Sequence, residues 1–494
     1  MLQMHWTGQT LVTRASRGRQ TKPAYLRCRH LCQLVAVLAV VHALPSVAQA
    51  AGFWNLGRGV STFGRGGANF IQPRDPIAVY TNPAALAGQR GLQLMVDGNI
   101  VFDNRAFERA PSDLDADGEL TEYARVQNSW APIPPSPGGF AAYNFGSLGL
   151  PELSVGAGVW GPPRSDTEFP EAGPQRYSAI SVNNLQIHYG LAAAYELPWL
   201  GLRVGATAQL IDQLVVQSLR LNVGELLFAE PEDPQYDVQA ALEAQDRAIP
   251  GGTLAVSAQP WEFLGFGVSL QLPWNVDARG TADIELGEGI RDLAEVQGDA
   301  VSVQVQMPMV VRAAVGYLDP TDRFDAELAF VWEGWSRNET TRISSDDIVF
   351  INALAPDEPI PLEDIELENN WRNAFSVRMG GSYQVVAQWL RVRAGGYYER
   401  GAVPDAYLAP ASFDLDKLGA TAGARIDFPY GLWLDVAAGY EHWLRQDIDN
   451  TEVRFTQPVD TGDDADASTW PIANGTYQNQ QFIVMAAIGM ALGL

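Results

Sequence analysis

The sequence predicts an all-β fold: a 14-stranded antiparallel transmembrane β-barrel with an N-terminal plug inside its lumen. Three observations predict it. Apolar and polar residues alternate with period two along many segments, and the connections between these segments are alternately short and long. Charged residues make up only 18% of the 494 residues, below the roughly 25% usual in soluble globular domains. Alternation joined by tight turns at one end and long loops at the other is typical of outer-membrane barrels.

Residues 1–50 are expected to be a secretory signal peptide. They hold six basic and no acidic residues, an apolar run at 34–44 and the small-x-small site Ala48-Gln49-Ala50, which together are typical of such leaders. The apolar run is too short to span a bilayer, and an N-terminal anchor helix is the alternative. Cleavage would change the net charge from -25 to -31 and would remove both cysteines, Cys28 and Cys32.

Residues 51–90 are expected to fold as the plug. The segment is glycine-rich at 57–67, contains Asn82-Pro83-Ala84, and is too irregular for a strand and too apolar for a free tail. Glycine permits close packing of the backbone against a wall, and a compact segment at the end of a barrel can close a lumen that would otherwise leak. A periplasmic linker is the alternative interpretation.

Residues 91–494 are expected to form the barrel with its long extracellular loops. In the run from Leu202 to Leu210, for example, every second residue is apolar, and the residues between them include Arg203 and Gln209. Tryptophans near the ends of several segments fit the aromatic girdles of membrane barrels. Strands are expected near residues 92, 138, 152, 179, 200, 253, 264, 299, 322, 371, 388, 414, 431 and 477. The long connections are expected at 103–137, 218–251, 343–370 and 447–476.

The composition argues against several classes of function. A chain with 58 acidic and 33 basic residues has no basic stripe that would bind nucleic acid. After the leader only His188 and His442 remain of the histidines, with no cysteine, which is a poor inventory for Ser-His, Cys-His or zinc catalysis. We therefore expect no enzyme, and an outer-membrane hydrolase is the rival interpretation from that class.

The four long connections hold 29 of the 58 acidic residues. A solvated rim is the simplest interpretation, and binding of divalent cations is the alternative. Within the first connection Asp113, Asp115 and Asp117, followed by Gly118, reproduce the first half of a calcium-binding loop. The twelfth position of such a loop requires a bidentate glutamate, but Ala124 stands there. Apart from a structural calcium ion at this loop, no cofactor is expected.

Several segments together make the chain resemble the long-chain fatty acid and hydrophobic-compound transporters of the Gram-negative outer membrane, the FadL, OmpP1 and TodX type. They are Ala51-Gly52-Phe53, Asn82-Pro83-Ala84, 330–336 (FVWEGWS), Trp371-Arg372-Asn373, 390–397 (LRVRAGGY), Ala402-Val403-Pro404 and the last strand from Tyr477. These segments span nearly all of the mature chain. Two features depart from the family, because the chain ends in Leu494 rather than in an aromatic residue and its loops are more acidic.

The resemblance implies transport of long-chain fatty acids or other hydrophobic small molecules. Ligands would be captured at the extracellular loops, pass to an apolar pocket in the lumen and leave sideways through a gap in the wall. Asn82, Pro83 and Ala84 would hold the plug, and Ala51, Gly52 and Phe53 would lie near bound ligand. The expected partners are the hydrophobic ligand, outer-membrane lipids and lipopolysaccharide, with the protein a monomer. A general diffusion porin or a structural outer-membrane barrel is the alternative.

Two arginines are candidates for contact with the carboxylate of a fatty acid. Arg391 and Arg393 share one face of one expected strand, and alternation turns that face toward the lumen. The alternative is a wall network with acidic residues such as Asp325 and Asp435, because buried cations are usually paired.

Other residues are candidates for the entry and the exit of a ligand. Leu226, Leu227 and Phe228 belong to an amphipathic stretch that would form an initial apolar groove. Glycine weakens a strand ladder and proline cannot donate to it. The candidates for a lateral opening are therefore Gly156, Gly158, Gly161 and Pro162, with ordinary strand termination as the alternative.

Overall fold

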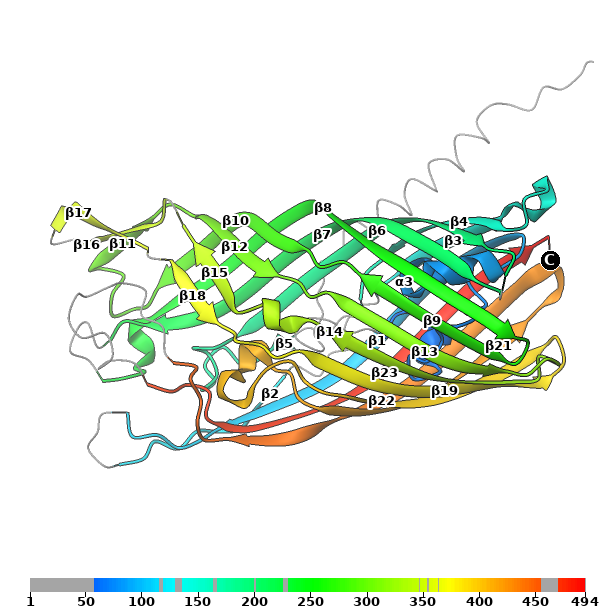
Figure 1. Cartoon of the computed structure of the whole chain (residues 1–494). Coiled ribbons are helices and arrows are strands. Elements are labelled where there is room, and N and C mark those ends of the chain that lie inside the picture. The colour runs from blue at the N-terminus through cyan, green and yellow to red at the C-terminus, as the bar shows by residue number, and fades with distance from the viewer. Residues whose placement is uncertain are drawn as a thin grey trace, which may run out of the picture. The chain divides into compact units, whose positions relative to one another are not determined.

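The computed structural model describes residues 57–114, 119–128, 136–162, 167–199, 201–224, 230–345, 347–352, 355–362, 364–454 and 470–493. Within these ranges fourteen strands form a closed antiparallel barrel (Figure 1). The last strand pairs with the first along its whole length, from Leu92 opposite Leu492 to Arg109 opposite Gly475. The predicted fold class is thereby confirmed, and the expected signal peptide lies outside the described residues.

The strands that close the barrel follow one another around the wall in chain order. They are β1 (Leu92–Arg109), β3 (Gly138–Asn144), β4 (Leu153–Trp160), β6 (Ser181–Glu196), β7 (Arg203–Asn222), β8 (Asp237–Trp261), β9 (Leu264–Gln271), β13 (Val310–Leu318), β14 (Phe324–Glu333), β19 (Ala374–Val386), β20 (Leu390–Glu399), β21 (Lys417–Asp427), β22 (Leu432–Ile448) and β23 (Gly475–Leu492). Tight turns such as those joining β3 to β4 and β8 to β9 lie at one end, called here the short-turn end. The opposite end is called the long-loop end.

The wall is apolar outside and polar inside. Along β7, Val204 and Leu210 are exposed while Thr207 and Gln209 on the other face are buried. The aromatic residues Trp199, Trp261 and Tyr430 are exposed in or beside the tight turns. An outward apolar band with an aromatic rim is the surface that a bilayer requires of a barrel. Among the described residues, no helix is both long and apolar enough to cross a membrane.

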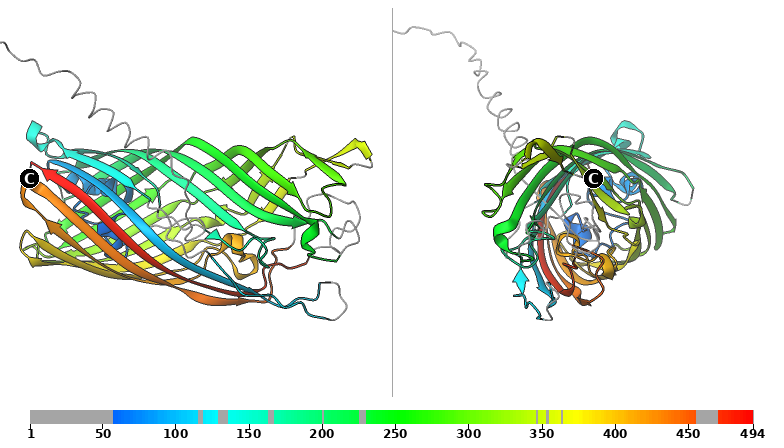
Figure 2. Two further views of the ribbon diagram at one scale, coloured as in Figure 1. Left: turned by 180° about the vertical axis from the view of Figure 1, so that it is seen from behind. Right: turned by 90° about the vertical axis from the view of Figure 1, so that its left-hand side faces the viewer.

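The wall continues beyond the barrel at the long-loop end, where loops were expected (Figure 2). β8 begins at Asp237 and pairs with β7 as far as Asn222, toward the long-loop end. The expected connection 218–251 is therefore mostly strand. Further strands extend this wall: β10 (Asn275–Leu286), β12 (Ala300–Gln306), β15 (Thr340–Ser344) and β18 (Ile365–Glu368). The smaller elements are β2 (Val126–Gln127), β5 (Thr167–Glu168) and a three-stranded sheet of β11 (Ala294–Gln297), β16 (Val349–Asn352) and β17 (Ala355–Pro361).

Residues 57–91 fill the lumen at the short-turn end. They contain α2 (Val60–Phe63), α3 (Ala78–Thr81) and the 3-10 helix η1 (Pro83–Gly88), and nearly all of these residues are buried. The short turns of such barrels face the periplasm, so the plug closes the periplasmic end.

Hydrogen bonds from the wall hold the plug backbone. The carboxylate of Glu327 accepts from Phe70 N at 2.7 Å and from Ile71 N at 3.0 Å. On another side the Thr207 hydroxyl donates to Val79 O at 2.8 Å. Gly205 lets the plug approach closely, because a Cβ atom there would lie 2.4 Å from Ala84 N. The wall is therefore shaped for the plug as well as bonded to it.

Candidate functional site

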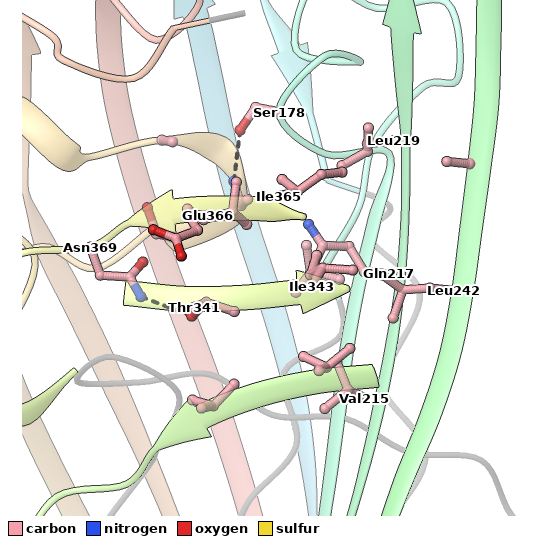
Figure 3. A pocket seen from close by; sticks show the side chains of 18 of the residues that line it. Ser178, Val215, Gln217, Leu219, Leu242, Thr341, Ile343, Ile365, Glu366 and Asn369 are labelled. Carbon is pink, nitrogen blue, oxygen red and sulfur yellow. Dashed lines mark hydrogen bonds between the residues drawn. The ribbon is translucent and has the colours of Figure 1, made fainter. Parts of the chain in front are cut away.

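A cavity of about 630 Å³ lies in the lumen at the long-loop end. Its walls come from β6, β7 and β8, from the extension strands β10, β12, β15 and β18, and from segments near residues 407–412 and 452–454. Figure 3 shows Leu219, Ile343 and Ile365 converging on this space from different strands. The volume lies in the range of roughly 300–1,000 Å³ that is usual for small-molecule sites.

Strand periodicity makes the cavity apolar. The inward face of β7 is polar near the plug, and toward the long-loop end it reads Val215, Gln217, Leu219 and Leu221. Leu242 of β8 and Val303 of β12 add to the same lining. Because the wall is extended beyond the barrel on this side, apolar side chains that a loop would expose instead line this cavity.

The polar groups of the cavity are mostly uncharged. Gln186 and Gln213 line it, and each leaves its amide oxygen without a hydrogen-bond partner among the described residues. Negative charge comes from Glu366, Glu368 and Glu452, and Glu366 forms an ion pair with Arg342. The basic residue among the described lining residues is Arg454, which already takes part in another interaction. The described lining thus provides no obvious site for an anionic headgroup.

Tyr177 closes one side of the cavity and is held by a buried charged cluster. Its hydroxyl donates to Asp237 Oδ1 at 2.9 Å, and the same carboxylate accepts from Arg176 Nε at 2.9 Å and Asn222 Nδ2 at 2.8 Å. Burial raises the pKa of Tyr177 well above its usual range, so the phenol remains a hydrogen-bond donor at neutral pH. The cluster ties segment 170–180 to the ends of β7 and β8.

Aromatic rings lie between the cavity and the plug. The rings of Trp160 and His188 are stacked with centroids 5.5 Å apart, and Trp274 meets His188 edge-on at 5.8 Å. Tyr80 of the plug packs against Trp160 at 5.8 Å. His188 lies two residues below the cavity-lining Gln186 on the inward face of β6. These rings therefore separate the cavity from the plug on this side of the lumen.

Hydrogen-bonded polar side chains surround the lumen near this aromatic layer. His188 Nδ1 lies 3.2 Å from Gln209 Oε1, and Gln209 Nε2 donates to Thr253 Oγ1 at 3.1 Å. On the far wall, Glu399 pairs with both Arg378 and Lys417. Together with the plug, these side chains occupy the lumen on the plug side of the cavity in the described part of the chain.

In the described part of the chain, the ladder on one side of β6 is not continuous beside the cavity. β4 pairs with β6 up to Trp160 opposite His188, and pairing of β6 resumes only where Thr167 of β5 lies opposite Val182. Residues 183–187 of β6 have no ladder partner on that side among the described residues. Asn184 and Gln186, which line the cavity, belong to this unpaired segment. The cavity lining and this segment of β6, which lacks a described ladder partner on one side, therefore lie on the same strand.

The four candidates for a lateral opening are placed differently. Gly156 and Gly158 lie in regular ladder positions of β4, opposite Ala142 and Phe140 of β3. A Cβ atom at Gly156 would lie 2.6 Å from Val79 Cγ2, so this glycine makes room for the plug. Gly161 and Pro162 directly follow the end of β4 and border the interrupted ladder.

Arg391 and Arg393 lie near the short-turn end and do not line the cavity. Arg391 pairs with Asp322 at 3.1 Å and Asp325 at 3.3 Å, and Arg393 pairs with Asp435 at 2.6 Å. The structure thus has both arginines in the wall network that was the alternative to carboxylate binding.

Asn82 of the Asn-Pro-Ala motif is fully buried and ties the plug to the wall. Its Nδ2 atom donates to Phe70 O at 2.8 Å and to Ser257 Oγ at 2.9 Å. Pro83 begins η1, and Ala84 packs over Gly205. The motif therefore occupies a structural position in the plug.

Other predicted sites lie outside the described residues. This applies to Ala51, Gly52 and Phe53, to Leu226, Leu227 and Phe228, and to Asp115 and Asp117. Asp113 is described, and no three His, Cys, Asp or Glu side chains cluster as metal ligands would in the described ranges.

Sequence reasoning found part of the cavity and missed the rest. Leu226, Leu227 and Phe228 were expected to form an initial apolar groove, and Leu219 and Leu221, which lie in the same expected connection 218–251, line the cavity. Ile343 and Ile365 were missed, although short period-two alternation around each was available as a signal. Tyr177 and Gln186 carry no pattern that would have marked them.

One family model matches most of the chain. Residues 41–473 match the family described as outer membrane protein transport protein (OMPP1/FadL/TodX). Outer membrane protein NMB0088 of Neisseria meningitidis serogroup B is 23% identical over 469 residues, which cover 88% of this chain and 94% of that protein.

Solved structures share the fold at low sequence identity. A Pseudomonas aeruginosa FadL homologue superposes with a TM-score of 0.66 at 14% identity, covering 91% of this chain and all of that chain. The Ralstonia pickettii toluene transporter TbuX gives a TM-score of 0.59 at 15% identity, covering 88% of this chain and 99% of its own. With a family match over most of its length, this chain belongs to the OMPP1/FadL/TodX family of Gram-negative outer-membrane β-barrels, which are non-enzymatic channels for hydrophobic compounds.

Proposed function

We propose that the protein captures hydrophobic small molecules at its extracellular end, holds them in the 630 Å³ cavity and releases them sideways into the outer membrane. One observation carries this proposal. The cavity is lined by Asn184 and Gln186, and these lie on the segment of β6 that has no ladder partner on one side among the described residues. The plug fills the short-turn end of the lumen, and a route past this segment of β6 would instead lead sideways toward the lipid.

The cavity suits a ligand that must also leave. Burial of each methylene contributes about 0.8 kcal/mol, so six buried methylenes would contribute about 5 kcal/mol before the costs of association. A net binding free energy of about 5 kcal/mol would correspond to a dissociation constant of about 0.2 mM, and the costs of association weaken binding further. Such a site concentrates a dilute hydrophobic compound without trapping it.

Uncharged cargo fits the described lining better than a carboxylate does. Glu366, Glu368 and Glu452 would repel an anion, and the arginines Arg391 and Arg393 are paired elsewhere. Among proteins of the same fold, TbuX is described as a toluene transporter. We therefore propose an uncharged aromatic or aliphatic compound as the preferred cargo. A long-chain fatty acid is the second candidate, because the amides of Gln186 and Gln213 would be able to hydrogen-bond its headgroup.

Ligand titrations of the purified protein test both parts of the proposal. N-phenyl-1-naphthylamine, an uncharged fluorescent probe, would be displaced by toluene or by oleate. We expect Leu242→Asp to weaken probe binding by at least about tenfold, because it buries a carboxylate in an apolar wall. The control is Leu148→Asp at the exposed β3–β4 turn. Equal affinities of the two variants for the probe would contradict the proposal that this cavity is the binding site. Preferential displacement of the probe by oleate would favour a fatty acid as the cargo.

The rival function of a general diffusion porin has a separate test. A plugged barrel should carry little steady current in a planar bilayer, whereas a porin is open to ions. A large, stable conductance of the wild-type protein would favour the porin.

A further inference from the structure

Two glutamine side chains form a polar pair in the wall of the cavity. Gln186 of β6 and Gln213 of β7 lie directly opposite each other in the β6–β7 ladder. Both line the cavity and are buried, with exposed fractions of 3% and 4%. Residues directly opposite each other in an antiparallel pair have Cβ atoms about 4.5–5.5 Å apart. The two carboxamides therefore form one polar surface, called here the glutamine pair.

Each member of the glutamine pair has an unused hydrogen-bond acceptor. The Oε1 atoms of Gln186 and Gln213 are buried and have no hydrogen-bond partner in the described part of the chain. The Nε2 atom of Gln213 donates to Leu214 O at 3.4 Å, which is long for such a bond. Buried polar atoms of folded proteins are nearly always hydrogen-bonded. The glutamine pair would therefore gain from a donor that enters the cavity.

Other uncharged polar groups of the lining are satisfied by the protein itself. Asn369 Nδ2 donates to Thr341 Oγ1 at 2.8 Å, and Ser178 Oγ accepts from Ala411 N at 3.2 Å (Figure 3). These bonds join neighbouring segments of the cavity wall. The glutamine pair differs from them, because an amide oxygen is left over on each of its two strands.

Apolar side chains lie close to the glutamine pair. Val215 is the next inward residue of β7 toward the long-loop end, and it also lines the cavity. Val276 of β10 and Val303 of β12 contribute further buried apolar surface to the same lining. A ligand in this cavity would therefore meet apolar side chains on several strands and the glutamine pair at one place.

The chemistry of the lining selects the kind of polar group that fits. A carboxamide carries no charge that would balance a carboxylate, and Glu366, Glu368 and Glu452 add negative charge to the cavity. A hydroxyl group is both a donor and an acceptor. It can therefore donate to an amide oxygen of the pair and also accept from an amide N–H.

We propose that the glutamine pair is a specificity-determining subsite for uncharged hydrophobic compounds that carry a hydroxyl group, such as phenols and alcohols. The apolar body of the ligand packs against the valine and leucine side chains, and its hydroxyl donates to Gln186 or Gln213. The terminal torsion of a glutamine side chain is broad, so each carboxamide can turn its oxygen toward the ligand. A site that hydrogen-bonds a hydroxyl discriminates against the analogue that lacks it. This inference rests on the proposed function.

Three ligands with one framework test the subsite. Toluene is the bare hydrocarbon, p-cresol adds a phenolic hydroxyl that stays protonated at pH 7, and p-toluate carries an ionised carboxylate. Each ligand is titrated against purified protein loaded with N-phenyl-1-naphthylamine, and displacement of the probe gives its affinity. We expect the wild-type protein to bind p-cresol more tightly than toluene, although water solvates the hydroxyl, and to bind p-toluate most weakly.

Matched variants locate this preference. Gln186→Met combined with Gln213→Met removes both carboxamides and keeps side chains of similar length. We expect its affinity for p-cresol to fall about tenfold, the effect of losing one hydrogen bond, and its affinity for toluene to stay unchanged. The control is Gln217→Met, because Gln217 lines the same cavity from the same face of β7 but lies opposite Val182. The affinity of each variant for the probe is measured first, and barrel assembly is checked by heat-modifiable migration on gels.

The outcomes distinguish the subsite from the proposed function. Wild-type protein that binds neither the probe nor any of the three ligands would overturn the proposed function. If the wild-type protein binds them but prefers toluene or p-toluate to p-cresol, the hydroxyl subsite is wrong, whether or not the variants assemble. The subsite is also wrong if the assembled double variant keeps its affinity for p-cresol, or loses affinity for toluene and p-cresol equally. An equal loss of p-cresol binding in Gln217→Met would likewise refute the assignment to the glutamine pair.

Discussion

Replacement of Glu327 by glutamine should release the plug without disturbing the barrel. Glu327 is buried, and its two carboxylate oxygens accept separate hydrogen bonds from the backbone of Phe70 and Ile71, at 2.7 and 3.0 Å. Glutamine has nearly the same shape but offers one acceptor in place of two. Its amide group would face a backbone N–H, so one buried donor would lose its partner.

The magnitude follows from these two bonds. A hydrogen bond to a charged acceptor contributes about 1.5–3 kcal/mol, and an unsatisfied buried donor costs about 1–3 kcal/mol. We therefore expect Glu327→Gln to weaken plug docking by about 3 kcal/mol, which raises the undocked population about 100-fold. Arg65 still pairs with Asp325, so the remaining anchors stay in place.

Single-channel recording in planar bilayers measures this population directly. Opening events of Glu327→Gln should be far more frequent than those of the wild type, because an undocked plug leaves the lumen open to ions. Glu262→Gln, at an exposed glutamate in the β8–β9 turn, is the control. If Glu327→Gln assembles normally and its openings are as rare as those of the control, the carboxylate does not hold the plug and the reasoning fails.

Three further predictions concern the plug and the loop above the cavity. Gly205→Val should displace η1 and lower the yield of assembled barrel on gels, because its Cβ atom would lie 2.4 Å from Ala84 N. The control Gly139→Val should assemble normally, because no atom lies within 4 Å of the added Cβ atom. Tyr177→Phe removes the hydrogen bond to Asp237, worth about 1.5–3 kcal/mol, and should speed hydrogen exchange of segment 170–180. Burial raises the pKa of Tyr177 above its ordinary 10.0. The contribution of its hydroxyl to the stability of segment 170–180 should therefore be complete below pH 10 and decline only above it. A decline of that stability near pH 7 would contradict the assignment.

The barrel could be predicted from the sequence because its cause is local. Side chains alternate between the two faces of a strand, and a wall between lipid and lumen needs opposite chemistry on those faces. The run from Leu202 to Leu210 already shows this pattern, and the structure exposes Val204 and Leu210 while burying Gln209. The tight turns, such as the one at Leu318–Phe324, end strands by the same local rules.

The site depended on contacts between distant segments, and alternation alone does not specify them. The periodicity of β7 shows that Leu219 and Leu221 share a face, but only pairing with β8 and the extension strands encloses that face as a cavity. Arg391 and Arg393 share a strand face as expected. The register of the neighbouring strands places Asp325 beside Arg391 and Asp435 beside Arg393, and the two carboxylates form ion pairs with the two arginines.

The sequence by itself determined the class of protein, because strand periodicity, turn spacing and family motifs depend on residues that are close together in the chain. The tertiary structure decided where the cavity lies and that Arg58 bonds to Asp97 and Gly161, which are 39 and 103 positions away in the chain. The strand register, the closure of the barrel and the docking of the plug all depend on contacts between residues that are far apart in the sequence. Their energies come from packing and from buried polar partners, which no local pattern encodes.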